Sequence, residues 1–380
     1  MIGGTGWLLR SAAATESTLA PVAYSLLGSS IMIQTGRSLH LAAVALLLTA
    51  APVVRAASIP VKVAVVVTFE VGADTGDKPG EFQFWAEREK WPLKIPVPGV
   101  DHPVLTDGAG VIGVVAGTTS RASNQIMALV LSGQFDFSKT YWVINGIAGV
   151  NPADASIGSA AWARYVIDGD VAYEIDSREG DAAWPYGIMP IGSSVPNTKP
   201  KAEGWEPASM AYPLNPALVA WAYGLTKGVP IPDSPDMAAY RALYAGYPNA
   251  QKPPFVFLGD TFGSCRYWHG RVLTQWANDW TRLWTEGKGN FAMSDMEDQG
   301  FAAALQRLGQ MGKVDFQRVL FLRTGSNYCM QPPGGNVSES LHFGFSGYIP
   351  SLEAAYRVGS TVVHELAGHW DRYGDRIPAP

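Results

Sequence analysis

Runs of apolar, β-branched residues alternate with amphipathic stretches in the first half of the chain, a pattern typical of alternating strands and helices. Short connections between them imply parallel strands joined by right-handed crossovers. The second predicted helix has Ser120 as its N-cap and Gly133 at its C-terminal end. Strands are predicted at residues 61–69, 110–117 and 140–146, and helices at 79–91 and 120–133.

The segment 163–176 predicts a β-hairpin that turns at Asp168-Gly169. Residues 177–254 are rich in Pro, Trp, Gly and Tyr and lack a clear period, so we expect a long excursion from the sheet within the same domain. Two helices are expected inside this excursion, Pro216–Lys227 and Pro235–Tyr244, the second capped by Ser234.

The alternation of strands and helices resumes after the excursion, which is why we treat residues 58–380 as a single domain of the α/β class. A long amphipathic helix closes the chain. The pattern predicts strands at 254–259 and 318–323, and helices at 270–286, 296–309 and 351–370.

Residues 1–57 are predicted to be a targeting segment rather than part of the fold. The apolar run Leu39–Val54 follows a basic residue and ends before small residues, as a secretory signal peptide does. A membrane anchor would need about 20 apolar residues. A normal-looking signal begins at Met32, so residues 1–31 are interpreted as a spurious extension from a misplaced start codon. We therefore expect an exported protein, periplasmic or secreted.

Composition narrows the class of protein further. Hydrophobic residues make up 47% of the 380 residues and charged residues 16%, enough apolar material for a large core and unlike a disordered chain. The net charge of −5 gives no electrostatic signature of nucleic-acid binding. Cys265 and Cys329 are too few for a zinc ribbon. In an exported protein they meet an oxidising compartment, and we expect them to form a disulfide if the loops that carry them edge one pocket.

The segment His364–His369, HELAGH, resembles the helix of zinc proteases. That motif needs two histidines at positions i and i+4 on one helix face. Here the second histidine is five residues on, turned by about 140° around a helix of 3.6 residues per turn. The motif therefore indicates a solvated helix, and no metal site is predicted.

Loops rich in glycine and hydroxyl groups follow several strands. Residues 117–123, GTTSRAS, join a strand to a helix, where backbone N–H groups favour an anion. Two glycines in 145–152 allow another group to approach the backbone closely. The loop 322–329 follows a strand at the edge where open α/β sheets bind ligands. In 294–300, SDMEDQG, acidic residues begin a helix, and from the residues alone simple dipole capping is the favoured explanation.

Taken in chain order, these segments resemble the nucleoside phosphorylase and nucleosidase superfamily, and within it the purine nucleoside permease family. The resemblance implies a three-layer α/β/α fold with a mixed, distorted central sheet. It covers most of residues 61–372. Four segments carry it: FEVGADTGDKPGEFQFW (69–85), GTTSRASNQIM (117–127), NGIAGVNPADASIGSAAWARYVIDGD (145–170) and GSCRYWHG (263–270).

The resemblance also implies roles for individual residues. Met296 and Glu297 correspond to the pair that holds the ribose, and an ionised carboxylate can accept both hydrogen bonds from vicinal hydroxyls. Asn327 faces the purine at a position where nucleosidases carry an aspartate that acts as general acid, and its amide would instead donate to N7 or O6. Gly146, Ala148, Gly149 and Ser326 are further substrate-binding candidates. The anion site is predicted at Gly72, Thr118, Thr119, Ser120 and Arg121.

The resulting hypothesis is an exported enzyme of nucleoside uptake and salvage that cleaves the N-glycosidic bond of purine nucleosides, with phosphate or water as acceptor. The phosphate-binding arginines of the superfamily do not map onto this sequence, and no organic cofactor is implied. The alternative is a non-catalytic periplasmic protein that binds the nucleoside and delivers it to an inner-membrane transporter. A channel is not expected, because no second apolar stretch approaches about 20 residues. Superfamily members usually form homo-oligomers.

Overall fold

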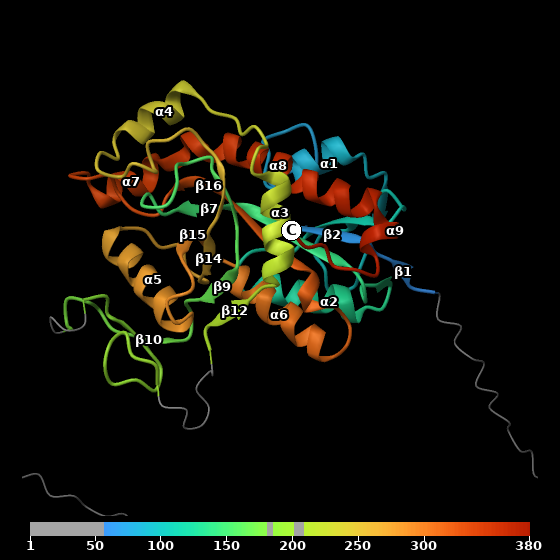
Figure 1. Cartoon of the computed structure of the whole chain (residues 1–380), viewed down its shortest axis with the longest axis horizontal. Helices are drawn as coiled ribbons and strands as arrows, with labels where there is room; N and C mark the ends of the chain where they lie inside the picture. Colours follow the sequence, from blue (N-terminus) through green and yellow to red (C-terminus); the bar gives the residue numbers. More distant parts are fainter. Residues whose placement is uncertain (1–56, 181–184, 201–208) are drawn as a thin grey trace, which may run out of the picture. The chain divides into compact units, whose positions relative to one another are not determined.

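Figure 1 shows the computed structural model, which describes residues 57–180, 185–200 and 209–380. The described residues form one compact unit. The targeting segment predicted at 1–57 lies outside the described residues except for its last position. Within the described part of the chain, no helix is both long enough and apolar enough to cross a membrane.

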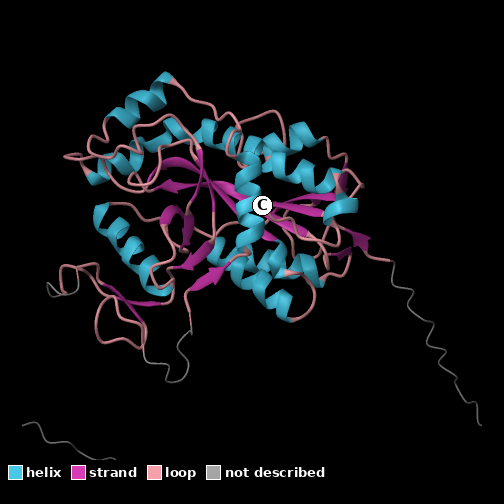
Figure 2. Cartoon of the chain, viewed as in Figure 1, coloured by secondary structure: helices cyan, strands magenta, loops and turns pink. Residues whose placement is uncertain are grey.

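A mixed β-sheet lies at the centre of this unit (Figure 2). Its main path runs in the order β12 (Ala211–Pro213), β9 (Tyr165–Asp168), β14 (Asp260–Gly263), β15 (Phe291–Asp295), β7 (Tyr141–Val150), β2 (Val63–Val67), β5 (Val111–Val115), β4 (Val104–Thr106) and β3 (Leu93–Ile95). Off this path, β16 (Val319–Tyr328) pairs with β7 and β8 (Ala160–Trp162), and β13 (Val256–Leu258) pairs with β8. Separate two-stranded pairs are β1 (Ile59–Pro60) with β6 (Phe135–Asp136), and β10 (Ala172–Glu174) with β11 (Ile188–Pro190).

Strand β7 changes its neighbour halfway along. Its first half, Tyr141–Ile144, pairs in parallel with β2, whereas its end pairs antiparallel with β15 through Gly149 and Val150. On its other edge, β16 runs parallel to it along nearly the whole length. Because β2 and β15 diverge beside β7, the sheet opens at this point, and α/β sheets bind ligands where strand order changes in this way.

Helices cover both faces of the sheet, which confirms the expected α/β class with a mixed central sheet (Figure 1). On one face, α8 (Tyr348–Gly368) packs on β7 and β16 and contacts α1 (Gln83–Glu89) and α3 (Pro216–Thr226). On the other, α2 (Ser120–Leu131) packs against α6 (Asp298–Gln310). The remaining helices are α4 (Pro235–Ala242), α5 (Arg271–Trp284), α7 (Val337–Phe343) and α9 (Trp370–Tyr373), with 3₁₀ turns at Phe316–Arg318 and Gly344–Gly347.

Close packing of α8 on β7 fixes the strand that crosses the site. A side chain at Gly359 of α8 would place its Cβ 2.6 Å from the amide nitrogen of Asn145, so only glycine lets the helix approach this closely. Asn145 is fully buried, and its amide donates to the carbonyl of Ala355 at 3.0 Å. Trp85 of α1 donates to the Asn145 side-chain oxygen at 3.3 Å, which joins α1 to the same point of β7.

The hairpin predicted at Asp168-Gly169 is wrong. Strand β9 ends at Asp168 and pairs with β12 and β14, whereas β10 pairs with β11. Gly169 serves close packing rather than a turn, because a Cβ there would lie 2.3 Å from the ring of Phe262. The 177–254 segment also returns to the sheet, since it contributes β12 at the edge.

The predicted N-cap of α2 is also displaced. Ser120 is the first helical residue, and Thr119 takes the N-cap position without a side-chain hydrogen bond. Thr119 has a φ of 58°, a left-handed conformation that costs a non-glycine residue of order 1–3 kcal/mol and is often found beside functional sites. For the second helix of the excursion the capping prediction is confirmed, because the Ser234 hydroxyl accepts from the backbone of Met237.

Candidate functional site

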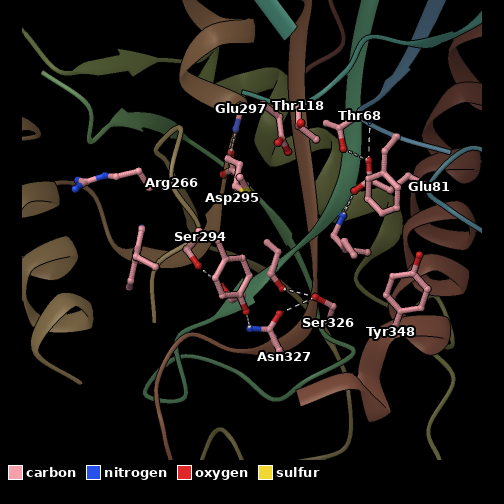
Figure 3. A pocket seen from close by; sticks show the side chains of 17 residues that line it. Thr68, Glu81, Thr118, Arg266, Ser294, Asp295, Glu297, Ser326, Asn327 and Tyr348 are labelled. Carbon is pink, nitrogen blue, oxygen red and sulfur yellow. Dashed lines mark hydrogen bonds between the residues drawn. The ribbon is translucent and has the colours of Figure 1, made fainter. Parts of the chain in front are cut away.

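A cavity of about 220 Å³ lies where β2 and β15 separate (Figure 3). Its walls come from the ends of β2, β15 and β16, the middle of β7, the loop after β14 and the first turn of α8. Aromatic rings are combined with a few hydroxyl, amide and carboxylate groups, as is typical of small-molecule sites. The lining residues are Thr68, Phe69, Glu81, Thr118, Ile147, Ala148, Gly149, Arg266, Tyr267, Trp268, Ser294, Asp295, Met296, Glu297, Ser326, Asn327 and Tyr348.

A β-bulge in β16 brings two consecutive side chains to the cavity. Gly325 pairs with Ala148 and Asn327 pairs with Gly149, so Ser326 is an extra residue without a partner on β7. In a regular strand, consecutive side chains point to opposite faces. The bulge breaks this alternation, and both Ser326 and Asn327 line the cavity.

One buried arginine organises the carboxylates at the other end of the cavity. The guanidinium of Arg323 lies 2.8 Å from Glu297 and 2.5 Å from Asp298, and 3.7 Å from Glu81. All four side chains are at least 95% buried. Gly146 of β7 makes this arrangement possible, because a Cβ there would lie 2.3 Å from the guanidinium.

Glu81 is held by three donors. One carboxylate oxygen accepts from the backbone and hydroxyl of Thr68 at 2.8 and 2.5 Å, and the other accepts from the backbone of Ile147 at 2.7 Å. The carboxylate therefore joins the end of β2 to β7, across the point where the sheet opens. Figure 3 shows it beside Thr68 on the wall of the cavity.

Burial shifts the protonation of these groups. It raises the pKa of Glu297 well above its usual range, and the nearby positive charge of Arg323 opposes this only in part. Burial also raises the pKa of Glu81, and it raises the pKa of Asp298 to about 7. These carboxyls share a single guanidinium, so its one positive charge can balance only one of them.

Asp295, Glu297 and Asp298 lie close enough together to hold a divalent cation, with ligand oxygens within 4.8 Å of one another. Arg323 already supplies a positive charge to Glu297 and Asp298. Asp295 has a structural task as well, since it accepts from the backbone N–H groups of Glu297 and Asp298 and so caps α6. These contacts explain the acidic group without a metal.

The sequence-predicted residues divide into two sets. Those that line the cavity are Thr118, Ala148, Gly149, Met296, Glu297, Ser326 and Asn327. Gly146 lies behind the wall, where it admits Arg323. Of the predicted anion site, Ser120 and Arg121 are exposed and Gly72 lies in an exposed loop closed by Asp77. These three residues and Thr119 do not line the cavity, so Thr118 is the one residue of the predicted anion site that does.

Sequence reasoning missed Glu81 and Tyr267, and it placed Arg323 in the ligand-side loop 322–329 without giving it a role. Glu81 gave a signal, because it is a single acidic residue between Gly80 and the apolar Phe82 within a segment that carried the family resemblance. The sequence also contained a signal for the role of Arg323, because a charged residue within a buried strand needs a partner of opposite charge. Tyr267 lies in a loop without periodicity, and only its place in GSCRYWHG marked it.

The expected Cys265–Cys329 disulfide is not formed. Cys265 is exposed and Cys329 is buried, and both are free. The strands that precede them, β14 and β16, are separated in the sheet by β15 and β7. The Cys265 sulfur accepts from the Gln299 side chain at 3.5 Å, whereas the Cys329 sulfur lies 3.4 Å from the Thr274 hydroxyl, so the two thiols have separate neighbours.

Comparison with known proteins identifies the family. The model of the purine nucleoside permease family matches residues 60–378, so the chain belongs to this family and the resemblance is confirmed. A probable purine nucleoside permease of Schizosaccharomyces pombe is 30% identical over 259 residues, which cover 66% of this chain and 74% of that protein. A purine nucleoside permease of Candida albicans is 29% identical over 273 residues, 70% of this chain and 64% of that protein, so the match spans just under two thirds of the Candida protein.

Among solved structures, a 5′-methylthioadenosine/S-adenosylhomocysteine nucleosidase from Colwellia psychrerythraea in complex with adenine aligns with a TM-score of 0.44 at 15% identity, covering 81% of this chain and 95% of that one. The futalosine hydrolase of Helicobacter pylori aligns with a TM-score of 0.46 at 12% identity, covering 80% of this chain and 98% of that one.

Proposed function

We propose that the cavity binds a purine nucleoside and that the chain cleaves its N-glycosidic bond with water as the acceptor. The observation that carries this proposal is the placement of two kinds of polar group on one cavity. Glu297 offers a buried carboxylate for vicinal ribose hydroxyls, and Asn327 lies in the lining on the bulge of β16. Membership of the purine nucleoside permease family supports the ligand class.

The charge of the lining favours water over phosphate. Glu81, Asp295 and Glu297 are acidic, and Arg266 is the single cation among the residues that line this cavity. Arg266 pairs with Glu174 at the surface, while Arg323 is enclosed by carboxylates. A phosphate dianion would meet like charges in a site of low dielectric constant, which opposes its binding.

In the proposed reaction, the bond from C1′ to the purine breaks and its electron pair leaves with the purine. The water oxygen bonds to C1′ and gives its proton to Glu81, and the purine takes up a proton from solvent. Burial raises the pKa of Glu81, and a carboxylate with a raised pKa is a better general base near neutral pH. Glu297 stabilises the positive charge that develops on the ribose.

Incubation of purified protein with inosine, with and without phosphate, tests this proposal. We expect free ribose and hypoxanthine at a rate independent of phosphate, and ribose 1-phosphate would instead identify a phosphorylase. In Glu81→Gln we expect kcat to fall roughly 10²- to 10⁴-fold, while inosine still binds. Glu179→Gln, on an exposed turn, is the matched control and should behave as wild type.

A second candidate, a non-catalytic nucleoside-binding protein that serves an inner-membrane transporter, is favoured by the description of the family. It predicts saturable inosine binding without release of hypoxanthine over long incubation. Both candidates need the same cavity, so release of the base separates them.

We also propose that the protein is exported through a cleaved signal peptide, as the apolar run before Ala57 suggests. Mass spectrometry of the periplasmic or secreted protein should find its N-terminus at Ala57 or Ser58. A protein that retains residue 40 would contradict cleavage.

A further inference from the structure

Three polar side chains form a continuous hydrogen-bonded chain along the cavity wall. The Ser326 hydroxyl donates to the side-chain oxygen of Asn327 at 2.9 Å. The Asn327 amide nitrogen donates to the hydroxyl of Tyr267 at 3.0 Å. All three residues line the cavity, and they come from two separate elements, the bulge of β16 and the loop after β14.

The orientation of the Asn327 amide is fixed by its second neighbour. The same amide nitrogen donates to the backbone carbonyl of Tyr328 at 3.0 Å. A flipped amide would place its oxygen against that carbonyl, where two acceptors repel each other. Both N–H groups of Asn327 are therefore committed, one to Tyr328 and one to Tyr267. In this arrangement Asn327 has no N–H left to donate to a purine.

The Tyr267 hydroxyl, by contrast, still has a hydrogen to donate. Its oxygen accepts from Asn327, and its own hydrogen has no acceptor among the described residues. Tyr267 is 54% exposed, so it lies at the rim of the cavity. Loss of hydration in this position raises the pKa of Tyr267, which keeps the hydroxyl protonated and able to donate.

We infer that Tyr267, rather than Asn327, donates the hydrogen bond that recognises the purine, and that Asn327 is a positioning residue that orients this hydroxyl. The inference rests on the proposed function, because it concerns the base of the same nucleoside. The recognised group is an acceptor on the edge of the purine, N7 or O6. Inosine offers both acceptors, so a single ligand detects either contact.

The experiment measures the dissociation constant of inosine for wild type, Tyr267→Phe, Asn327→Ala and the double variant. Stopped-flow tryptophan fluorescence reads binding before turnover, and Trp268 in the lining supplies a reporter. We expect Tyr267→Phe to weaken binding roughly 3- to 10-fold, the value of one neutral hydrogen bond. Tyr173→Phe, on the exposed edge of β10, is the matched control and should bind as wild type.

The double variant distinguishes positioning from direct contact. If Asn327 acts through Tyr267, Asn327→Ala weakens binding several-fold in the wild-type background and has little effect when Tyr267 is already Phe. If Asn327→Ala lowers the affinity for inosine equally in both backgrounds, Asn327 contacts the purine itself. If the affinity of Tyr267→Phe is unchanged, Tyr267 does not contact the purine. Either result overturns the inference while the proposed function stands. If the wild-type protein binds no inosine, both the inference and the proposed function are wrong.

Fluorine NMR of protein labelled with fluorotyrosine provides a second readout. The Tyr267 resonance is identified by its loss in Tyr267→Phe. We expect it to shift on addition of inosine and also in Asn327→Ala, because both change the hydrogen bonds of this hydroxyl. A resonance that does not shift when inosine is added would contradict the inference, because the surroundings of a hydroxyl that donates to the ligand change on binding.

Discussion

At the scale of single residues, the site depends on a buried guanidinium that is held by three carboxylates. Arg323 contacts Glu297, Asp298 and Glu81, and each of them is buried. A buried ion pair adds little net stability compared with apolar residues, but the loss of one partner leaves an uncompensated charge. Arg323 therefore holds the carboxylates of the cavity in place, and its own removal is expected to be costly.

The first prediction concerns this arginine. In Arg323→Met the buried carboxylates lose their counter-charge, and we expect a loss of roughly 3–5 kcal/mol in the free energy of unfolding. Urea denaturation followed by circular dichroism measures it. Arg307→Met, on the exposed side of α6, is the control and should unfold near the wild-type midpoint. An unchanged midpoint in Arg323→Met would contradict the role given to this residue.

The second prediction concerns the ribose end of the cavity. Glu297→Ala removes a buried carboxylate that accepts hydrogen bonds from two ribose hydroxyls, each worth roughly 1.5–3 kcal/mol, so inosine should bind about 10²- to 10⁴-fold more weakly. Hypoxanthine has no ribose, and its affinity should change little. Calorimetric titration with both ligands makes the comparison. Equal losses for inosine and hypoxanthine would show that Glu297 does not contact the sugar.

At the scale of elements, the bulge in β16 determines which side chains reach the cavity. Its extra residue, Ser326, lies between two positions that keep their register with β7. The Ser326 hydroxyl lies 3.2 Å from the carbonyl of Ala148 and 2.9 Å from Asn327, so the bulge has hydrogen bonds of its own. Bulges of this kind redirect side chains beside active sites.

The third prediction removes the bulge. Deletion of Ser326 restores strict alternation, so only one of the two consecutive side chains still faces the cavity, and Asn327 loses the hydrogen bond that it accepts from the Ser326 hydroxyl. We expect inosine affinity to fall more than tenfold. Ser326→Ala keeps the bulge and loses one hydroxyl, so it should cost only a few-fold. Circular dichroism checks that both variants are folded, and a folded deletion variant with wild-type affinity would contradict the prediction.

The same bulge shows why the sequence predicted some elements and missed others. Strand β2 and helix α2 were predicted within a few residues, because long apolar or periodic runs identify their own secondary structure. The segment 318–323 was predicted as a strand, yet β16 continues to Tyr328 through small and polar residues that resemble a loop. No local pattern marks the bulge, since its register depends on pairing with β7, far away in the sequence.

At the scale of the whole molecule, the site exists because distant segments meet where the sheet opens. Strand β15 was not predicted from the sequence, although it places Met296 and Glu297 in the cavity. Its five residues, FAMSD, have neither alternation nor a β-branched run, so only tertiary pairing with β14 and β7 makes them a strand. The family resemblance located these residues along the chain, but Glu81 and the contacts of Arg323 with the carboxylates emerged only from the fold.

The last prediction follows from the charge that the fold buries at this meeting point. Burial raises the pKa of Glu297 above its unfolded value, so the folded state holds this proton more tightly than the unfolded chain does. Below the unfolded pKa both states are protonated and the group costs nothing. Above the unfolded pKa, the unfolded chain ionises while the buried carboxyl stays protonated, so the fold loses stability as pH rises toward and through the folded pKa.

Glu297→Gln removes this ionisation while it keeps the shape of the side chain. The free energy of unfolding of Glu297→Gln, measured relative to wild type, should therefore increase steadily from about pH 5 to pH 8, because only wild type loses stability as the pH rises. Its affinity for inosine should fall at the same time, as expected when a destabilised site residue serves binding. Urea denaturation of both proteins across this range measures the difference. Parallel stability curves would show that Glu297 is already ionised in the fold at pH 5, and that Arg323 compensates its burial in full.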